Sequence, residues 1–118
     1  MAFDVDEVEA LLIGAARAGQ PLTYSEALAA LGHRFTRLLM RQLCVVLGEV
    51  DARGRGRGDP ELAVLVVRQS DSLPGQGWWM TERGYAGPWQ GPEARAHVTA
   101  RQAKAIARWQ HPKRKDNT

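Results

Sequence analysis

Hydrophobic residues recur every three to four positions along three stretches in the first half of the chain. This spacing predicts amphipathic helices over residues 4–17, 24–31 and 34–52. The third helix should bury one broad face and carry arginines on the other. The positions expected to be buried on it are Phe35, Leu38, Leu39, Leu43, Val46 and Val50.

Two local signals define the second helix and its end. Thr23 and Glu26 have the spacing of a capping box, in which each side chain satisfies a free backbone donor of the other residue. Gly32 stands where a residue with a left-handed backbone would close the helix. A short capped helix, a glycine turn and a longer basic helix together predict a helix-turn-helix, whose second helix enters the major groove of DNA.

The pattern changes after the third helix. Glycine alternates with arginine in the segment 53–60, which predicts a flexible basic loop. A β-branched run predicts a buried strand over residues 62–67, and turn residues fill 69–77. Residues 78–80 are predicted to form a second strand that pairs with the first, as in the wing of a winged helix.

The last predicted element is a helix over residues 92–110, with Pro92 in its first turn. A glycine- and proline-rich connector at 83–92 precedes it, and a polar tail at 112–118 is expected to be disordered. The expected fold is one α+β domain over residues 1–111. It is winged-helix-like, with three helices, a two-stranded wing and a long C-terminal helix.

The 118 residues carry a formal net charge of +3, but this charge is unevenly distributed. Residues 1–32 have a net charge of −4 and residues 33–58 of +4, while residues 59–92 come to −2 and residues 93–118 to +5. Two basic blocks on an otherwise acidic chain can form a positive face, which favours a polyanionic partner. A solvated arginine-rich surface without a ligand is the alternative.

Composition limits the remaining classes of function. The single cysteine, Cys44, excludes a disulfide within the chain and favours a reducing compartment. No apolar run approaches the roughly 20 residues that span a bilayer, and the acidic start of the chain is unlike a signal peptide. We therefore expect a cytoplasmic protein without a membrane partner.

The sequence contains no recognisable centre for chemistry. His33, His97 and His111 lie far apart and have no cluster of cysteines or carboxylates at ligand spacing, so we expect neither a metal nor another cofactor. Serine-glycine elbows and phosphate-binding glycine loops are also absent from the sequence. We therefore expect no enzymatic activity; the one alternative is a catalytic subunit in which a cleft gathers His33 or His97 with acids.

Two sets of arginines are candidates for contacts to nucleic acid. One set lies on the polar face of the third helix: Arg34, Arg37 and Arg41. The other set lies in the glycine-rich loop: Arg53, Arg55 and Arg57. Guanidinium groups on a helix could contact phosphates or a guanine edge, and a flexible basic loop could follow the backbone. Either set could instead be solvated surface.

Three aromatic residues have two interpretations each. Tyr24, at the start of the second helix, could contact a phosphate or cap the core with its hydroxyl in water. Trp78 and Trp79 are adjacent on a predicted strand, so their side chains should point to opposite faces. One should be core, and the other could be covered by the last helix or exposed to a partner protein or a stacking base. A protein-interaction module or homodimer is therefore the alternative to DNA binding.

The segment from Tyr24 to Gly32, followed by arginines and a hydrophobic helix, resembles the winged-helix half of the alkylguanine-DNA alkyltransferases and the alkyltransferase-like proteins. In these families a tyrosine disturbs a DNA phosphate, and a following arginine fills the gap left by a flipped base. The resemblance implies these roles for Tyr24 and, with one residue deleted from the turn, for Arg37.

The alkyltransferases also carry a Pro-Cys-His-Arg-Val motif after the recognition helix, whereas this chain reads Pro-Glu-Leu-Ala-Val-Leu-Val-Val at residues 60–67. Cys44 lies within the third helix and does not match the reactive cysteine. The resemblance therefore implies a winged-helix scaffold and not alkyl transfer. The chain also looks like small uncharacterised bacterial proteins, a likeness that implies no activity. The expected function is non-enzymatic DNA binding, as a small regulator or an accessory factor.

Overall fold

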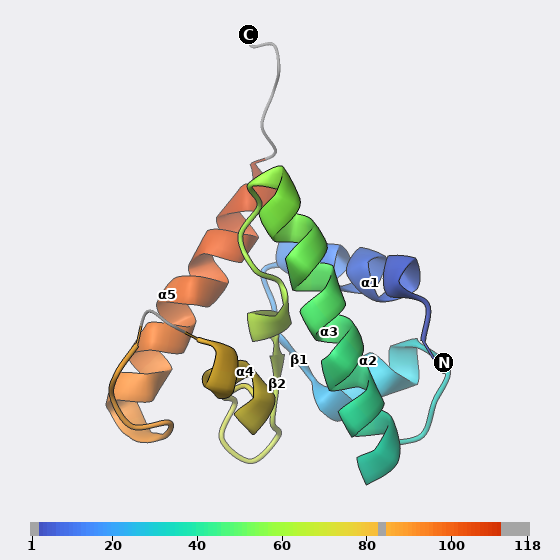
Figure 1. Ribbon diagram of the computed structural model, residues 1–118, viewed down its shortest axis with the longest axis horizontal. Coiled ribbons are helices and arrows are strands. Elements are labelled where there is room, and N and C mark those ends of the chain that lie inside the picture. The colour runs from blue at the N-terminus through green and yellow to red at the C-terminus, as the bar shows by residue number, and fades with distance from the viewer. Residues whose placement is uncertain (1–2, 83–84, 112–118) are drawn as a thin grey trace, which may run out of the picture.

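The described part of the chain forms five α-helices, a short 3-10 helix and a sheet of two strands (Figure 1). The computed structural model describes residues 3–82 and 85–111. In chain order the elements are α1 (Val5–Ala18), β1 (Leu22–Thr23), α2 (Tyr24–Ala30), α3 (Arg37–Arg57), the 3-10 helix η1 (Ala63–Leu65), β2 (Val66–Val67), α4 (Gln76–Thr81) and α5 (Gly91–Gln110). These elements confirm the expected α+β class. The tail expected at 112–118 lies outside the described residues.

Side chains cap the amino ends of the first two helices. The carboxylate of Asp4 accepts the Asp6 N–H at 2.9 Å at the start of α1. The capping box of α2 is confirmed, because the Glu26 N–H donates to Thr23 Oγ1 at 3.0 Å and the Thr23 N–H donates to Glu26 Oε1 at 2.9 Å. The turn after α2 is closed by Gly32, whose φ of +87° is left-handed as predicted.

The two strands run parallel, with Leu22 beside Val66 and Thr23 beside Val67. Parallel neighbours need a long crossover connection. Here that connection contains both α2 and α3, so the pairing of two-residue strands fixes both ends of the segment that holds these helices.

The strands differ from those predicted. Residues 78–80 lie in α4, so the prediction of a second strand there is wrong, and no antiparallel hairpin forms among the described residues. The strand predicted at 62–67 is correct only at its end, because residues 63–65 form η1. Every residue from 62 to 67 is buried. A continuous apolar run can be buried in a 3-10 turn as well as in a strand, so the pattern alone does not distinguish the two conformations.

α3 continues through the segment predicted to be a loop and ends only at Arg57. A glycine inside a helix costs about 1 kcal/mol relative to alanine, but tertiary contacts can outweigh this cost. Gly54 is buried beside Asp59 and Pro60, which return along the helix. The helix ends at Gly58, where φ is +80°.

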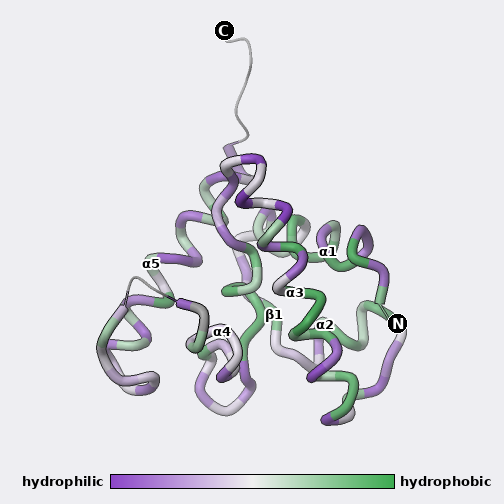
Figure 2. Tube along the Cα trace, in the orientation of Figure 1, coloured by the Kyte–Doolittle hydropathy of each residue, from purple (hydrophilic) through white to green (hydrophobic). Residues whose placement is uncertain are grey.

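The main core lies where α1, α3 and the strands meet, with α2 and the end of α5 packed around it. Figure 2 shows hydrophobic residues along the middle of α3, and hydrophilic residues at the carboxyl end of α3 and over much of α5. A second cluster joins η1 and α4 to the first half of α5. Its buried members are Val64, Leu73, Trp79, Ala94 and Val98.

Candidate nucleic-acid interface

The amino end of α3 reaches beyond α2 at the edge of the molecule (Figure 1). Thr36 is its N-cap, and Thr36 Oγ1 accepts the Leu39 N–H at 3.0 Å. The helix therefore begins at Arg37, three residues later than predicted. Arg34 lies in the turn before the helix, and Arg37 and Arg41 share one face because they are four residues apart.

This end of the helix carries positive charge without a nearby counter-charge. The side chains of Arg34, Arg37 and Arg41 are exposed, and none forms an ion pair within the described residues. The first turn of α3 contains no acidic residue. A helix amino end already has a partial positive charge, which acidic residues usually offset. Here the arginines add to that charge, and the result is a surface that attracts anions.

Apolar side chains are exposed beside these arginines. Phe35, Leu38 and Val45 are 44%, 61% and 61% exposed. The prediction that Phe35 and Leu38 are buried is wrong, because Phe35 precedes the helix and the first turn of α3 extends past the elements on which the helix packs. The deeper positions are buried as predicted: Leu43, Val46 and Val50.

Tyr24 does not contribute to this surface. Its side chain is only 5% exposed, and its hydroxyl accepts the Gly75 N–H at 3.1 Å. The same hydroxyl lies 3.8 Å from Cys44 Sγ. A Cβ at position 75 would come within 2.8 Å of the hydroxyl, so only glycine fits there. This phenol is therefore a core group, and its burial raises its pKa. The prediction that Tyr24 contacts a phosphate is corrected.

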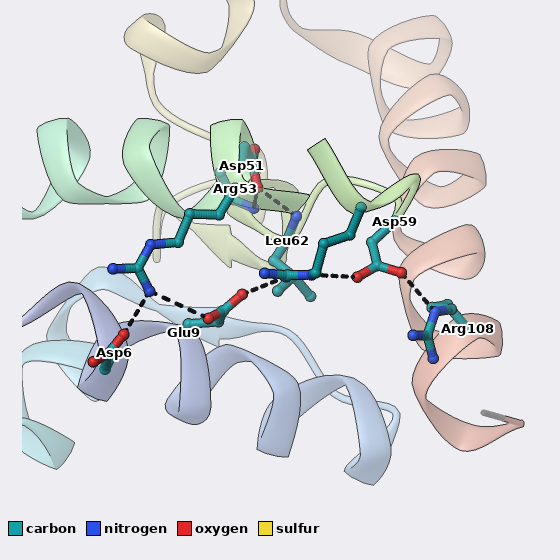
Figure 3. Close-up of polar contacts among 9 residues, drawn as sticks. Asp6, Glu9, Asp51, Arg53, Asp59, Leu62 and Arg108 are labelled. Carbon is teal, nitrogen blue, oxygen red and sulfur yellow. Dashed lines mark hydrogen bonds and ion pairs between the residues drawn. The ribbon is translucent and has the colours of Figure 1, made fainter. Parts of the chain in front are cut away.

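Arg53 points toward α1 (Figure 3), and both Arg53 and Arg57 form ion pairs with acids of that helix. Arg53 Nη1 lies 2.5 Å from Asp6 Oδ1, and Arg57 Nη2 lies 2.6 Å from Glu9 Oε2. Arg57 Nε also contacts Asp59 Oδ2 at 3.1 Å. The prediction of a mobile loop whose arginines track a nucleic-acid backbone is therefore corrected for these two residues.

Asp59 links the ion pairs at the carboxyl end of α3 to α5. Its second oxygen, Oδ1, accepts a hydrogen bond from Arg108 Nε at 2.8 Å (Figure 3). Burial alone would raise the pKa of Asp59, but the hydrogen bonds from Arg108 and Arg57 hold it below its ordinary value. The carboxyl end of α3 is therefore tied to both the first and the last helix.

The two adjacent tryptophans are packed rather than presented as an interaction surface. Both lie in α4, so they are not on opposite faces of a strand. Trp79 is buried, and its indole N–H donates to the Pro74 carbonyl at 3.1 Å. Trp78 is half-buried, and its indole N–H donates to a carboxylate oxygen of Glu61. The surface predicted on Trp78 and Trp79 is therefore corrected.

The structure also brings together groups that the sequence analysis did not select. Glu82 Oε2 lies 2.5 Å from His97 Nε2 and 2.9 Å from Arg101 Nε, which joins the end of α4 to α5. The four-residue spacing of His97 and Arg101 on one helix was the available signal. No group of three or more His, Cys, Asp or Glu side chains suited to a metal ion occurs among residues 3–82 and 85–111.

Asp51 is another residue that the sequence analysis did not select and that makes contacts between distant parts of the chain. Asp51 Oδ1 accepts the N–H groups of Leu62 at 2.7 Å and Ala63 at 3.1 Å, and so holds the chain that returns from α3. Burial raises the pKa of Asp51 to about 6, although these two hydrogen bonds lower it. Asp51 also lines a cavity of about 270 Å³ together with Cys44 and Trp78.

No protein-family model matches the chain, and neither a curated protein nor a solved structure is similar enough to count as a match. The likeness to the alkyltransferases therefore stays a prediction. None of the described helices is long and apolar enough to cross a bilayer.

Proposed function

We propose that this chain binds nucleic acid, in the first place duplex DNA, through the amino half of α3, and that it acts by binding alone. One observation carries the proposal. Three exposed guanidinium groups, those of Arg34, Arg37 and Arg41, stand at a projecting helix end, with no ion pair to a described acid. Phosphates would supply the counter-charge that the described chain does not.

The order of the elements supports this docking. α2 and α3 follow one another in the chain, with the turn at Gly32 between them. In the helix-turn-helix that we propose for this pair, the first residues of the second helix would contact base edges. A helix with its side chains is about 10–12 Å wide and fits a major groove about 12 Å wide. Exposed Leu38 would then lie where a thymine methyl group can be contacted.

The test is a fluorescence-anisotropy titration of a short labelled duplex, repeated over a range of salt concentrations. The triple variant Arg34→Gln/Arg37→Gln/Arg41→Gln should bind at least about 100-fold more weakly, because each lost contact is worth about 1–3 kcal/mol. The slope of log K against log salt should fall by about 3, because each lost phosphate contact releases one counterion fewer.

A second triple variant, Arg17→Gln/Arg53→Gln/Arg57→Gln, removes the same total charge and is the matched control. Arg17 is exposed at the end of α1, and the other two arginines are paired with acids. The control should bind nearly as tightly as the original chain. The proposal fails if the unaltered chain binds neither duplex nor single-stranded DNA at low salt, or if both triple variants lose the same affinity.

A second candidate function is docking to a protein, including a second copy of this chain. The exposure of Phe35, Leu38 and Val45 favours it, because exposed apolar side chains beside arginines are typical of interface centres. Light scattering distinguishes the two. A dimer mass that returns to the monomer mass in Leu38→Asn/Val45→Asn, together with unchanged DNA affinity, supports the second candidate.

A further inference from the structure

The carboxyl end of α3 and the second half of α5 enclose an open groove of about 710 Å³. Arg55 of α3 lies on one side, and Arg101, Lys104 and Arg108 of α5 lie on the other. Gly58, Pro60 and Ala107 also line the groove, and their small side chains leave the space open.

Cations outnumber acids in this groove by four to two, and both acids are already engaged. Asp59 is held between Arg57 and Arg108, and the carboxylate of Glu61 accepts the indole N–H of Trp78. Arg55 and Lys104 are exposed and form no ion pair within the described residues. The groove therefore has a net positive charge that its own acids do not cancel.

The other two cations of the groove, Arg101 and Arg108, still have N–H donors that can bind a further anion. Arg101 is bonded to Glu82 through Nε, and Arg108 is bonded to Asp59 through Nε. A guanidinium carries five N–H donors, so one bond through Nε leaves others available. Phosphate oxygens are suitable acceptors for them.

Arg55 also lies in line with the arginines at the other end of α3. It follows Arg37 by five full helical turns, so the two side chains leave the same side of α3 about 27 Å apart. Gly48 and Ala52 are exposed between them on this side and carry no long side chain. Two acids lie between the arginines. Exposed Glu49 is about a third of a turn away from this line. Asp51 is about 40° away but half-buried, with Oδ1 accepting the Leu62 and Ala63 N–H groups.

We propose that this groove is a second phosphate-binding site, which holds the backbone of the same nucleic acid that meets the amino end of α3. The inference rests on the proposed function. It adds that the polyanion runs along the length of α3 instead of touching its tip alone. An open groove with cations on two facing helices suits an extended chain of phosphodiesters.

The anisotropy titration described above tests this with the double variant Arg55→Gln/Lys104→Gln. Loss of two phosphate contacts should lower the salt slope by about 2 and weaken binding by about 5- to 30-fold near physiological salt. The matched control Arg17→Gln/Arg95→Gln removes two exposed cations elsewhere and should change neither quantity. Thermal unfolding followed by circular dichroism verifies that both double variants are folded.

The two proposals fail in different ways. If the unaltered chain binds no DNA, the proposed function fails and the groove assignment falls with it. If it binds DNA and the variant Arg55→Gln/Lys104→Gln binds with the same affinity and salt slope, the groove assignment alone is overturned. The last measurement is a calorimetric titration with inorganic phosphate. If the unaltered chain binds phosphate saturably, and the variant loses this binding but keeps its DNA affinity, the groove is a site for a free anion and the assignment to nucleic acid is overturned.

Discussion

The two ends of α3 carry the same kind of side chain in opposite surroundings. At the amino end, Arg37 and Arg41 are exposed and no acid occupies the first turn. At the carboxyl end, Arg53 and Arg57 face Asp6 and other acids, and their charges are neutralised. One helix thus has an exposed basic end and an end that ion pairs anchor to α1; the latter is called the anchoring end below.

The difference depends on where α1 lies. The acids in its first turns, Asp6 and Glu9, pair with arginines at the carboxyl end of α3 (Figure 3), and none pairs with Arg37 or Arg41 at the amino end. The number of arginines in a segment therefore does not show whether they are free to meet an anion. Their freedom depends on whether another part of the folded chain brings carboxylates to the arginines, and a count of charges along the sequence cannot detect such contacts.

The largest expected difference between the two ends concerns stability. Leu47 is buried at the middle of α3, where the helix packs on the core, whereas Leu38 is mostly exposed at its amino end. Leu47→Ala should reduce the free energy of unfolding by about 2–5 kcal/mol, because it leaves a cavity. Leu38→Ala should change it by less than about 0.5 kcal/mol. Urea unfolding followed by circular dichroism measures both values, and equal losses would contradict the division into two ends.

Asp51 should make the anchoring end sensitive to pH. Its pKa in the folded chain is about 6, above the ordinary value of 3.8, so the folded chain binds an extra proton between these values. The stability from this group is fully present below about pH 4 and is lost as the pH rises through about 6. Two pKa units correspond to about 3 kcal/mol.

The variant Asp51→Asn tests this, because asparagine keeps an oxygen acceptor for the Leu62 and Ala63 N–H groups but does not titrate. Unfolding in urea at a series of pH values should show a flatter dependence between pH 4 and 6 for the variant. An identical pH dependence in both proteins would show that Asp51 is not the group responsible.

The smallest expected effect comes from single ion pairs. Arg57→Gln removes the contacts to Glu9 and Asp59, and it should lower stability by about 1 kcal/mol or less, because exposed pairs are weakened by solvent and salt. Arg37→Gln should leave stability unchanged and weaken DNA binding instead. Unfolding curves at low and high salt, paired with anisotropy titrations, measure both variants. If Arg57→Gln weakens DNA binding as much as Arg37→Gln does, the two ends are not distinct.

Local signals predicted the helical parts of the fold well. The capping box at Thr23 and Glu26, the left-handed Gly32 and the helix from about 92 to 110 all agree with the structure. Each of these depends on residues within a few positions of one another, so the sequence contains the whole signal.

The errors arose where distant contacts decide the conformation. Three glycines made the end of α3 look like a loop, but Asp6 and Glu9 of α1 stabilise it as a helix by pairing with Arg53 and Arg57. The spacing of these arginines by four residues, with Gly58 as a stop, was the signal that could have revealed the helix.

The burial of Tyr24 could not be predicted from its own neighbourhood. It depends on Gly75, which lies 51 positions further along the chain. The exposed arginines Arg34, Arg37 and Arg41 were identified from the sequence, but their separation from acidic residues is a property of the folded chain alone.

The contact between α1 and α5 has a consequence for how this protein is made. The side chain of Gln110 donates to the Arg17 carbonyl, across 93 positions, and Ala105 packs into the same core as Leu12. A nascent chain on the ribosome can close this apolar core only after the residues of α5 have been synthesised. Until then the inner side of the first helix stays open to solvent, and to chaperones that recognise such surfaces.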